Sequence, residues 1–201
     1  SGGCGSRMPD PSPYARDEIV AEPERVHARG VAFWNALSTR VFFAPIGTAW
    51  SPADNVRHLT KSIAAVSAGL RVPRTLVALL FGRPPAASRT FEGVRDDYRQ
   101  VLAAGGTAGR FAPTPSRHGA TPDADRARIM TAHRAAVGEL RARVTRWSDA
   151  DLDRHRFPHP LVGKLTVREM LLFTLYHNQH HVDGVQRRLA ADVENPQSGP
   201  R

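Results

Sequence analysis

Cysteine is almost absent from the chain: its 201 residues include only Cys4, in the glycine-rich segment at the start. A single cysteine excludes a disulfide scaffold and a cysteine-rich metal site. Its position argues against a cysteine nucleophile as well, because we expect residues 1–13 to be a flexible terminus or a non-native remnant. The lack of disulfides favours the cytoplasm.

Long apolar runs are also missing. The apolar stretch over residues 75–81 is far shorter than the roughly 18–20 residues that cross a bilayer. The start of the chain shows no charged segment followed by an apolar one, as a signal peptide would. We therefore expect a cytoplasmic protein with no membrane partner.

Lysine occurs only at positions 61 and 164, so the basic residues behind the formal net charge of +9 are nearly all arginines. These arginines are scattered along the chain. Nucleic-acid binding calls for a basic stripe with aromatic partners or a known reading motif. The sequence shows neither, and we expect no nucleic-acid partner.

Strand-like alternation is absent too, and helical periodicity takes its place. Four stretches have the spacing of long amphipathic helices: 15–39, 51–70, 121–147 and 166–191. Residues 71–120 are less regular, with a short helix over 90–103, and residues 157–160 are extended because of their prolines. The sequence therefore predicts an all-α, up-and-down four-helix bundle over 14–191, with a decorated connection between the second and third long helices. Residues 192–201 are expected to be a disordered tail.

Two of these helices begin with clear signals. Ser51 is a predicted N-cap, followed by Pro52 in the first helical position and Asp54 in the third. Thr166 and Glu169 have the spacing of a capping box at the start of the last helix. The tryptophans are expected to lie in the core: Trp34, Trp50 and Trp147.

His177 and His181 are the residues that point most clearly to chemistry. Four residues on a helix place two side chains on one face, about 40° apart, where their nitrogens could reach one cation. This spacing is a weak signal by itself, because with His180 the pair could equally form a partly solvated helix face. A metal site would need a third ligand from another helix.

His58 is the candidate third ligand. It lies off the apolar seam of its helix, on a side with small and polar residues that could border a cavity or face solvent. His133 is the rival: on an apolar stripe, it would be either a buried histidine bonded to a carbonyl or water, or a fourth ligand. His159 is either an ordinary loop residue or one that overhangs the site.

Three segments together resemble the DinB-like superfamily, and most closely its YfiT-type metal-dependent branch. They are Trp50–Leu59, His159–Thr166 and Tyr176–His181. The resemblance covers most of residues 15–190. It implies a bundle that is often dimeric, with one divalent metal ion held by histidines that match His58, His177 and His181. His180 matches a position that is often histidine but is not a ligand.

The resemblance also suggests a class of reaction. Three neutral imidazoles leave coordination positions open, and imidazole suits zinc, nickel and iron. Such a metal could activate water or bind a thiolate. The family includes mycothiol- and bacillithiol-dependent transferases, so we expect transfer of a low-molecular-weight thiol to a small-molecule electrophile. The alternatives are a metal-dependent hydrolase and a non-catalytic binding bundle. Asp54 and Asn55 are candidates for holding the histidines' other nitrogens.

Overall fold

The computed structural model describes residues 15–113 and 118–194. The predicted terminal segment 1–13 and most of the predicted tail, residues 195–201, lie outside the described residues. No single helix in the described ranges is both long and apolar enough for a membrane span. The helices Pro52–Arg71 and Arg74–Phe81, bent by 106° at the break between them, pass the test of length and composition only when they are taken together.

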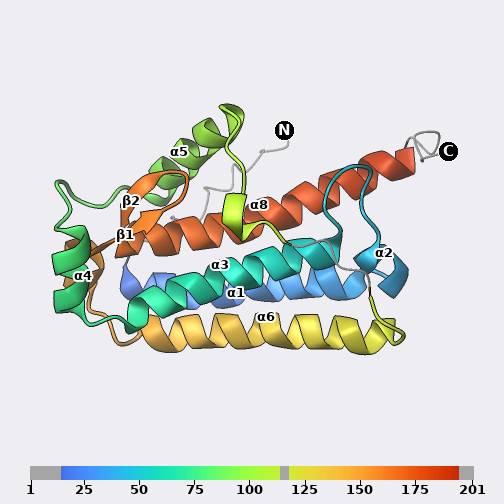
Figure 1. The fold of residues 1–201 in the computed structure, drawn as a ribbon, viewed down its shortest axis with the longest axis horizontal. Coiled ribbons are helices and arrows are strands. Elements are labelled where there is room, and N and C mark those ends of the chain that lie inside the picture. The colour runs from blue at the N-terminus through green and yellow to red at the C-terminus, as the bar shows by residue number, and fades with distance from the viewer. Residues whose placement is uncertain (1–14, 114–117, 195–201) are drawn as a thin grey trace, which may run out of the picture.

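Four long helices form the bundle in Figure 1. They are α1 (Arg16–Ala36), α3 (Pro52–Arg71), α6 (Pro122–Val144) and α8 (Val167–Glu194). The shorter elements are α2 (Thr39–Phe43), α4 (Arg74–Phe81), α5 (Phe91–Ala103), the 3-10 turn η1 (Gly109–Phe111), α7 (Asp149–Arg154), β1 (Arg156–His159) and β2 (Gly163–Thr166). The predicted helical fold and four-helix bundle are confirmed, and α8 extends past its expected end at residue 191.

The order of the helices departs from strict alternation. Helix α1 packs against α6 and α8, and α3 packs against the same two helices. Helices α1 and α8 run in one direction, while α3 and α6 run in the other (Figure 1). The indole N–H of Trp147 donates to the carbonyl of Leu70 at 3.4 Å, which joins the ends of α3 and α6. Because α3 and α6 are parallel, residues 72–121 must return along the bundle, and they form α4, α5 and η1 on the way.

Capping interactions fix where α3 and α8 begin. The Ser51 hydroxyl oxygen accepts the Asp54 N–H at 3.1 Å and donates to the Asp54 carboxylate at 2.7 Å. At the start of α8, the Glu169 N–H donates to the Thr166 hydroxyl at 3.0 Å, and the Glu169 carboxylate accepts the Thr166 N–H at 2.9 Å. Both caps follow the sequence prediction, and they set the register of the histidines further along each helix.

A short antiparallel hairpin of β1 and β2 precedes α8. The extended backbone over 157–160 was predicted, but the expectation of no strand was wrong. Phe157 pairs with Leu165 and both are buried, while Gly163 has a φ of +78° that only glycine adopts readily. Strands of only four residues are too short to show a clear alternation of apolar and polar positions.

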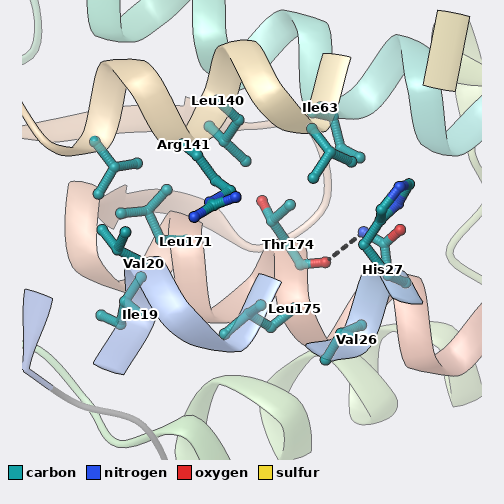
Figure 2. Close-up of a pocket in the computed structure, with 13 residues that line it drawn as sticks. Ile19, Val20, Val26, His27, Ile63, Leu140, Arg141, Leu171, Thr174 and Leu175 are labelled. Atoms are coloured by element: carbon teal, nitrogen blue, oxygen red, sulfur yellow. Dashed lines mark hydrogen bonds between the residues drawn. The ribbon is translucent and has the colours of Figure 1, made fainter. Parts of the chain in front are cut away.

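The bundle interior is closely packed. Trp34 and Trp147 are buried, as predicted, but Trp50 is only half-buried and lines a cavity. Between α1, α6 and α8 lies a small internal cavity of about 30 Å³ with mostly apolar walls (Figure 2). Its polar edge includes the Asn178 side-chain amide, which donates to the Thr174 carbonyl at 2.8 Å. A space of this size holds little more than one water molecule.

Candidate metal centre

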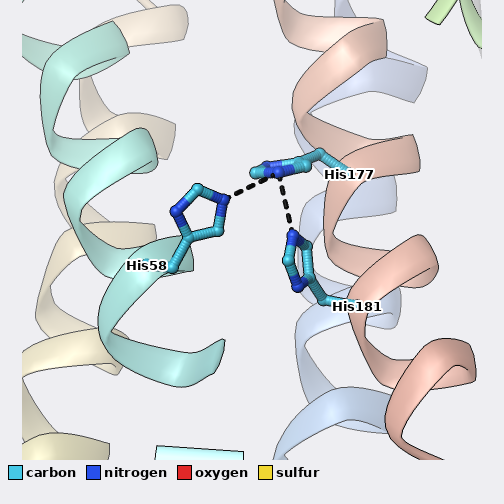
Figure 3. A group of neighbouring side chains, drawn as sticks. All are labelled: His58, His177 and His181. Carbon is cyan, nitrogen blue, oxygen red and sulfur yellow. Dashed lines mark hydrogen bonds between the residues drawn. The ribbon is translucent and has the colours of Figure 1, made fainter. Parts of the chain in front are cut away.

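Helices α3 and α8 bring His58, His177 and His181 together. Figure 3 shows the three rings facing one another in the space between the two helices. The Nε2 atom of His177 lies 3.1 Å from Nε2 of His58 and 3.1 Å from Nε2 of His181. All three ligand atoms lie within 4.8 Å of one another.

These separations fit a shared cation. Two imidazole nitrogens that each lie about 2.0–2.1 Å from a tetrahedral zinc ion are roughly 3.3 Å apart. The two separations that involve His177, at 3.1 Å, are close to that value, and the separation between His58 and His181 is no more than 4.8 Å. A cation could therefore be accommodated by shifts of the rings that bring His58 and His181 closer together.

Hydrogen bonds at the far side of two rings decide which nitrogen carries the proton. Nδ1 of His58 lies 2.8 Å from the carbonyl oxygen of Phe111, which can only accept, so Nδ1 is the donor. Nδ1 of His181 lies 2.7 Å from Oδ1 of Asn55. The Asn55 amide nitrogen already donates to Ser51 and Trp50 carbonyls, so its oxygen is the acceptor. A neutral ring protonated at Nδ1 has its lone pair at Nε2, and both lone pairs point into the cluster.

His177 is buried, with 4% of its surface exposed, the same fraction as His58. The ring of Phe173 stacks on it at 5.0 Å between centroids and 21° between planes, which fixes its orientation. Within the described part of the chain, Nδ1 of His177 has no hydrogen-bond partner. Its position is therefore set by packing rather than by a bond at the outer nitrogen.

Burial keeps these imidazoles neutral. It lowers the pKa of His177 and His181 well below the usual value, with further lowering by the neighbouring histidines. The pKa of His58 is also lowered, first by burial and also by the charge of Lys61, against an opposing effect of the Phe111 carbonyl. Metal binding needs the neutral imidazole, so the surroundings favour the binding form.

A cavity of about 430 Å³ opens from the cluster. Trp50 forms part of its wall, stacked on His181 with centroids 6.2 Å apart and tilted against His58 at 5.2 Å. His180 and His159 also line this cavity, and neither belongs to the three-histidine cluster. Of the two alternatives predicted for His159, its place in the cavity wall fits the one in which it overhangs the site.

His133 lies elsewhere, in the contact between α6 and α3. Its Nδ1 is 3.1 Å from the hydroxyl of Thr60, which itself donates to the carbonyl of Val56 at 2.7 Å. The hydroxyl therefore accepts from His133. His133 is a buried histidine held by a hydrogen bond, as one alternative predicted, but the acceptor is a hydroxyl rather than a carbonyl or water.

Sequence reasoning found some of the supporting residues and missed others. Asn55 does hold a histidine, whereas Asp54 caps its own helix through Ser51. The Phe111 carbonyl was missed, because a backbone acceptor in an irregular segment leaves no signal in the sequence. Trp50 was placed in the core; the signal that could have found its role is that it directly precedes the helix carrying His58.

Two solved structures have a similar fold. One is YfiT from Bacillus subtilis, described as a probable metal-dependent hydrolase with an unusual four-helix bundle topology. It has a TM-score of 0.57 and 15% identity, over 95% of this chain and 93% of YfiT. The other is the four-helix bundle protein TT2238, with a TM-score of 0.55 and 18% identity, over 86% of this chain and 98% of TT2238. At such identities the likeness shows the fold alone.

No curated protein matches the chain. The family model of the DinB superfamily matches residues 22–183, a range that contains all three clustered histidines. A match over this much of the sequence shows membership as well as fold. The chain belongs to the DinB superfamily.

Proposed function

We propose that this protein is a metal-dependent enzyme that holds one divalent cation on His58, His177 and His181 and hydrolyses a small molecule in the adjoining cavity. The observation that carries the proposal is the convergence of the three Nε2 atoms beside a cavity of about 430 Å³. Cavities of a few hundred cubic ångströms are typical of small-molecule sites.

The protein's own groups prepare the site for this role. The Phe111 carbonyl and Asn55 keep the protons of His58 and His181 on the outer nitrogens, and burial keeps the rings neutral. Three protein ligands leave room for a substrate or water, the arrangement of a catalytic rather than a structural site. A bound divalent cation would supply Lewis-acid chemistry there, lowering the pKa of water toward about 7 and polarising a carbonyl.

The size of the cavity favours hydrolysis over transfer between two organic reactants. A volume of about 430 Å³ suits one small ligand, and a water molecule needs little additional room. The similarity in fold to YfiT, described as a probable metal-dependent hydrolase, supports the same choice.

Thiol transfer is the second candidate, and Arg110 is the observation that favours it. Arg110 lies in η1, is exposed and lines the cavity. A guanidinium at that position could hold a carboxylate of a mycothiol- or bacillithiol-type thiol. The thiol would have to come from such a cofactor, since the chain's only cysteine is Cys4.

The experiment measures metal content and activity in matched variants. Purified wild-type protein is expected to contain about one divalent ion per chain by elemental analysis. His181→Gln should bind zinc more than about 100-fold more weakly, since losing even an outer hydrogen-bond partner of a ligand costs about 10–100-fold. His180→Gln is the matched control. His180 directly precedes His181 in the sequence but lies outside the cluster, so this variant should keep the metal.

Activity is then measured on a panel of aromatic and aliphatic esters and amides, with and without added thiol. Release of the acid without thiol supports hydrolysis, whereas a thiol adduct supports transfer. Equal metal content in wild type and His181→Gln would overturn the proposed metal centre for both reactions.

A further inference from the structure

The cavity beside the cluster has walls that are mostly apolar. It extends from the three histidines to the β1–β2 hairpin, and its side includes Val66, Phe81, Phe157, Leu161, Met170 and Phe173. Such walls stabilise a ligand by removing its apolar surface from water. They bind an isolated ionic group poorly, because its hydration would be lost without compensation. Most of a ligand's surface in this cavity must therefore be apolar and uncharged.

His159 supplies a polar group in this wall, and its hydrogen bonds fix its tautomer. Its Nδ1 accepts the backbone N–H groups of Leu161 and Val162, both at 3.2 Å. A nitrogen that accepts carries no hydrogen, so the proton of the neutral ring is on Nε2. Among the described residues, both hydrogen bonds to the His159 ring are made at Nδ1. The Nε2–H lies on the other side of the ring from the turn and is therefore an available donor.

The donor is held in place by the hairpin. His159 ends β1 and pairs with Gly163, which begins β2 at a φ of +78°. The two N–H groups that donate to the His159 ring belong to the turn between β1 and β2, so the side chain stabilises this turn and is held in place by it. Burial lowers its pKa to about 4, and the ring is neutral at pH 7. His159 is thus a rigid, uncharged donor rather than a cation.

One aromatic ring separates His159 from the cluster. The centroid of Phe173 lies 4.3 Å from that of His159 and 5.0 Å from that of His177. Tyr98 has its ring edge-on to both histidines, at 6.5 Å and 6.0 Å. A ligand that lies along Phe173 in the cavity therefore has the three-histidine cluster at one end and the ring of His159 at the other.

We infer that the cavity selects a mostly apolar molecule with an uncharged hydrogen-bond acceptor, such as a carbonyl, and that the Nε2–H of His159 binds this acceptor. His159 would be a specificity-determining residue, remote from the bond that reacts. The inference rests on the proposed function only in taking the substrate to occupy this cavity. An uncharged acceptor fits better than a carboxylate, because His159 brings no positive charge to balance it.

The test compares two ligands of the same shape, 2-acetylnaphthalene and 2-isopropenylnaphthalene, of which only the first has an acceptor. Their dissociation constants are measured with the full chain, as purified and after treatment with chelator. We expect the wild type to bind the ketone roughly three- to tenfold more tightly in both states, the effect of one net hydrogen bond. Nitrogen-15 NMR of labelled histidines should show His159 as the Nε2–H tautomer, with a shift at Nε2 when the ketone binds.

Two variants separate the donor from the structural role of the ring. His159→Asn keeps an acceptor near the position of Nδ1 for the turn, but its shorter side chain places no donor at the position of Nε2, so it should bind both ligands equally. His159→Gln keeps a donor near the position of Nε2 and should retain part of the preference for the ketone. An Nδ1–H tautomer, equal binding of the ligands by wild type, or an unchanged preference in His159→Asn would overturn the inference. None of these outcomes depends on metal, so a failure here is distinct from a failure of the metal centre.

Discussion

For the three clustered histidines, the position of each ring proton decides what the site can bind. His58 and His181 both present lone pairs at Nε2, and both lie 3.1 Å from Nε2 of His177. If His177 carries its proton on Nε2, a single N–H can donate well to only one of them. One buried acceptor then lacks a good partner, at a cost of about 1–3 kcal/mol. A cation satisfies all three nitrogens at once, so the arrangement favours metal over a network of hydrogen bonds.

Asn55 gives a prediction at this scale. Its oxygen holds Nδ1–H of His181 at 2.7 Å, and this fixes both the tautomer and the direction of the ring. Asn55→Leu has a similar volume but no acceptor. We expect it to weaken zinc binding by about 10–100-fold, measured by competition with a chromophoric chelator.

Asn178→Leu is the matched control for this change. The amide of Asn178 donates to the carbonyl four residues earlier, at Thr174, just as the amide of Asn55 donates to Ser51. It holds no histidine, so zinc affinity should stay at the wild-type value. Wild-type affinity in Asn55→Leu would show that the hydrogen bond to His181 does not support the ligand.

The sequence identified these residues only in part. The spacing of His177 and His181 predicts a shared helix face, which depends on local geometry alone. The periodicity did not decide whether His58 borders a cavity or faces solvent, because a polar side of a helix has the same sequence pattern in both cases. The structure decides this point by burying His58 to 4% exposure against Phe111, through a contact between residues distant in sequence.

Among the elements, helix starts were predicted well because their signals are local. Ser51 begins α3 about two turns before His58, and Thr166 with Glu169 begins α8 about two to three turns before His177. The contact between α3 and α6 could not be predicted in the same way, because it depends on the long return of residues 72–121. His133 and Thr60 lie in that contact.

His133 gives a prediction about pH and the packing of α3 against α6. Burial, and then the nearby His27, lower its pKa from 6.5 to about 4. Between these values the unfolded chain binds a proton that the folded chain does not. The stabilising effect of the neutral ring is therefore complete above pH 6.5 and is lost as pH falls toward 4. Protonation of His133 should therefore lower the free energy of unfolding of the wild type by roughly 3 kcal/mol as the pH falls from 6.5 to 4.

The measurement compares urea unfolding of wild type and His133→Asn at several pH values in the presence of chelator. Asparagine keeps a donor for the Thr60 hydroxyl but does not titrate. The free energy of unfolding of the variant should fall less steeply between pH 6.5 and 4, by about the amount given above. Equal slopes in the two proteins would mean that His133 accepts a proton in the folded state without penalty.

At the scale of the whole molecule, the parallel pairing of α3 with α6 produces the cavity. Because both helices run the same way, the intervening chain crosses the outside of the bundle, and its η1 segment supplies the Phe111 carbonyl and Arg110. The hairpin before α8 supplies another part of the wall through His159. The sequence indicated a decorated connection but not where it lies, since irregular segments have no periodicity to read. The homodimer implied by the family resemblance stays a prediction.

Metal removal tests whether the proposed ion stabilises the whole fold. The three histidines come from α3 and α8, which pack against each other, so only the folded chain holds their nitrogens within 4.8 Å. A ligand bound only by the folded state, at a free concentration a thousand times its dissociation constant, stabilises that state by about 4 kcal/mol. For a chain of this length we expect chelator to lower the melting temperature by roughly 10 °C, and added zinc to restore it. His181→Gln, which should bind zinc more than about 100-fold more weakly, should show at most about a third of this change. If the wild type melts at the same temperature with chelator as with any concentration of added zinc, the cluster does not bind the ion in the folded protein.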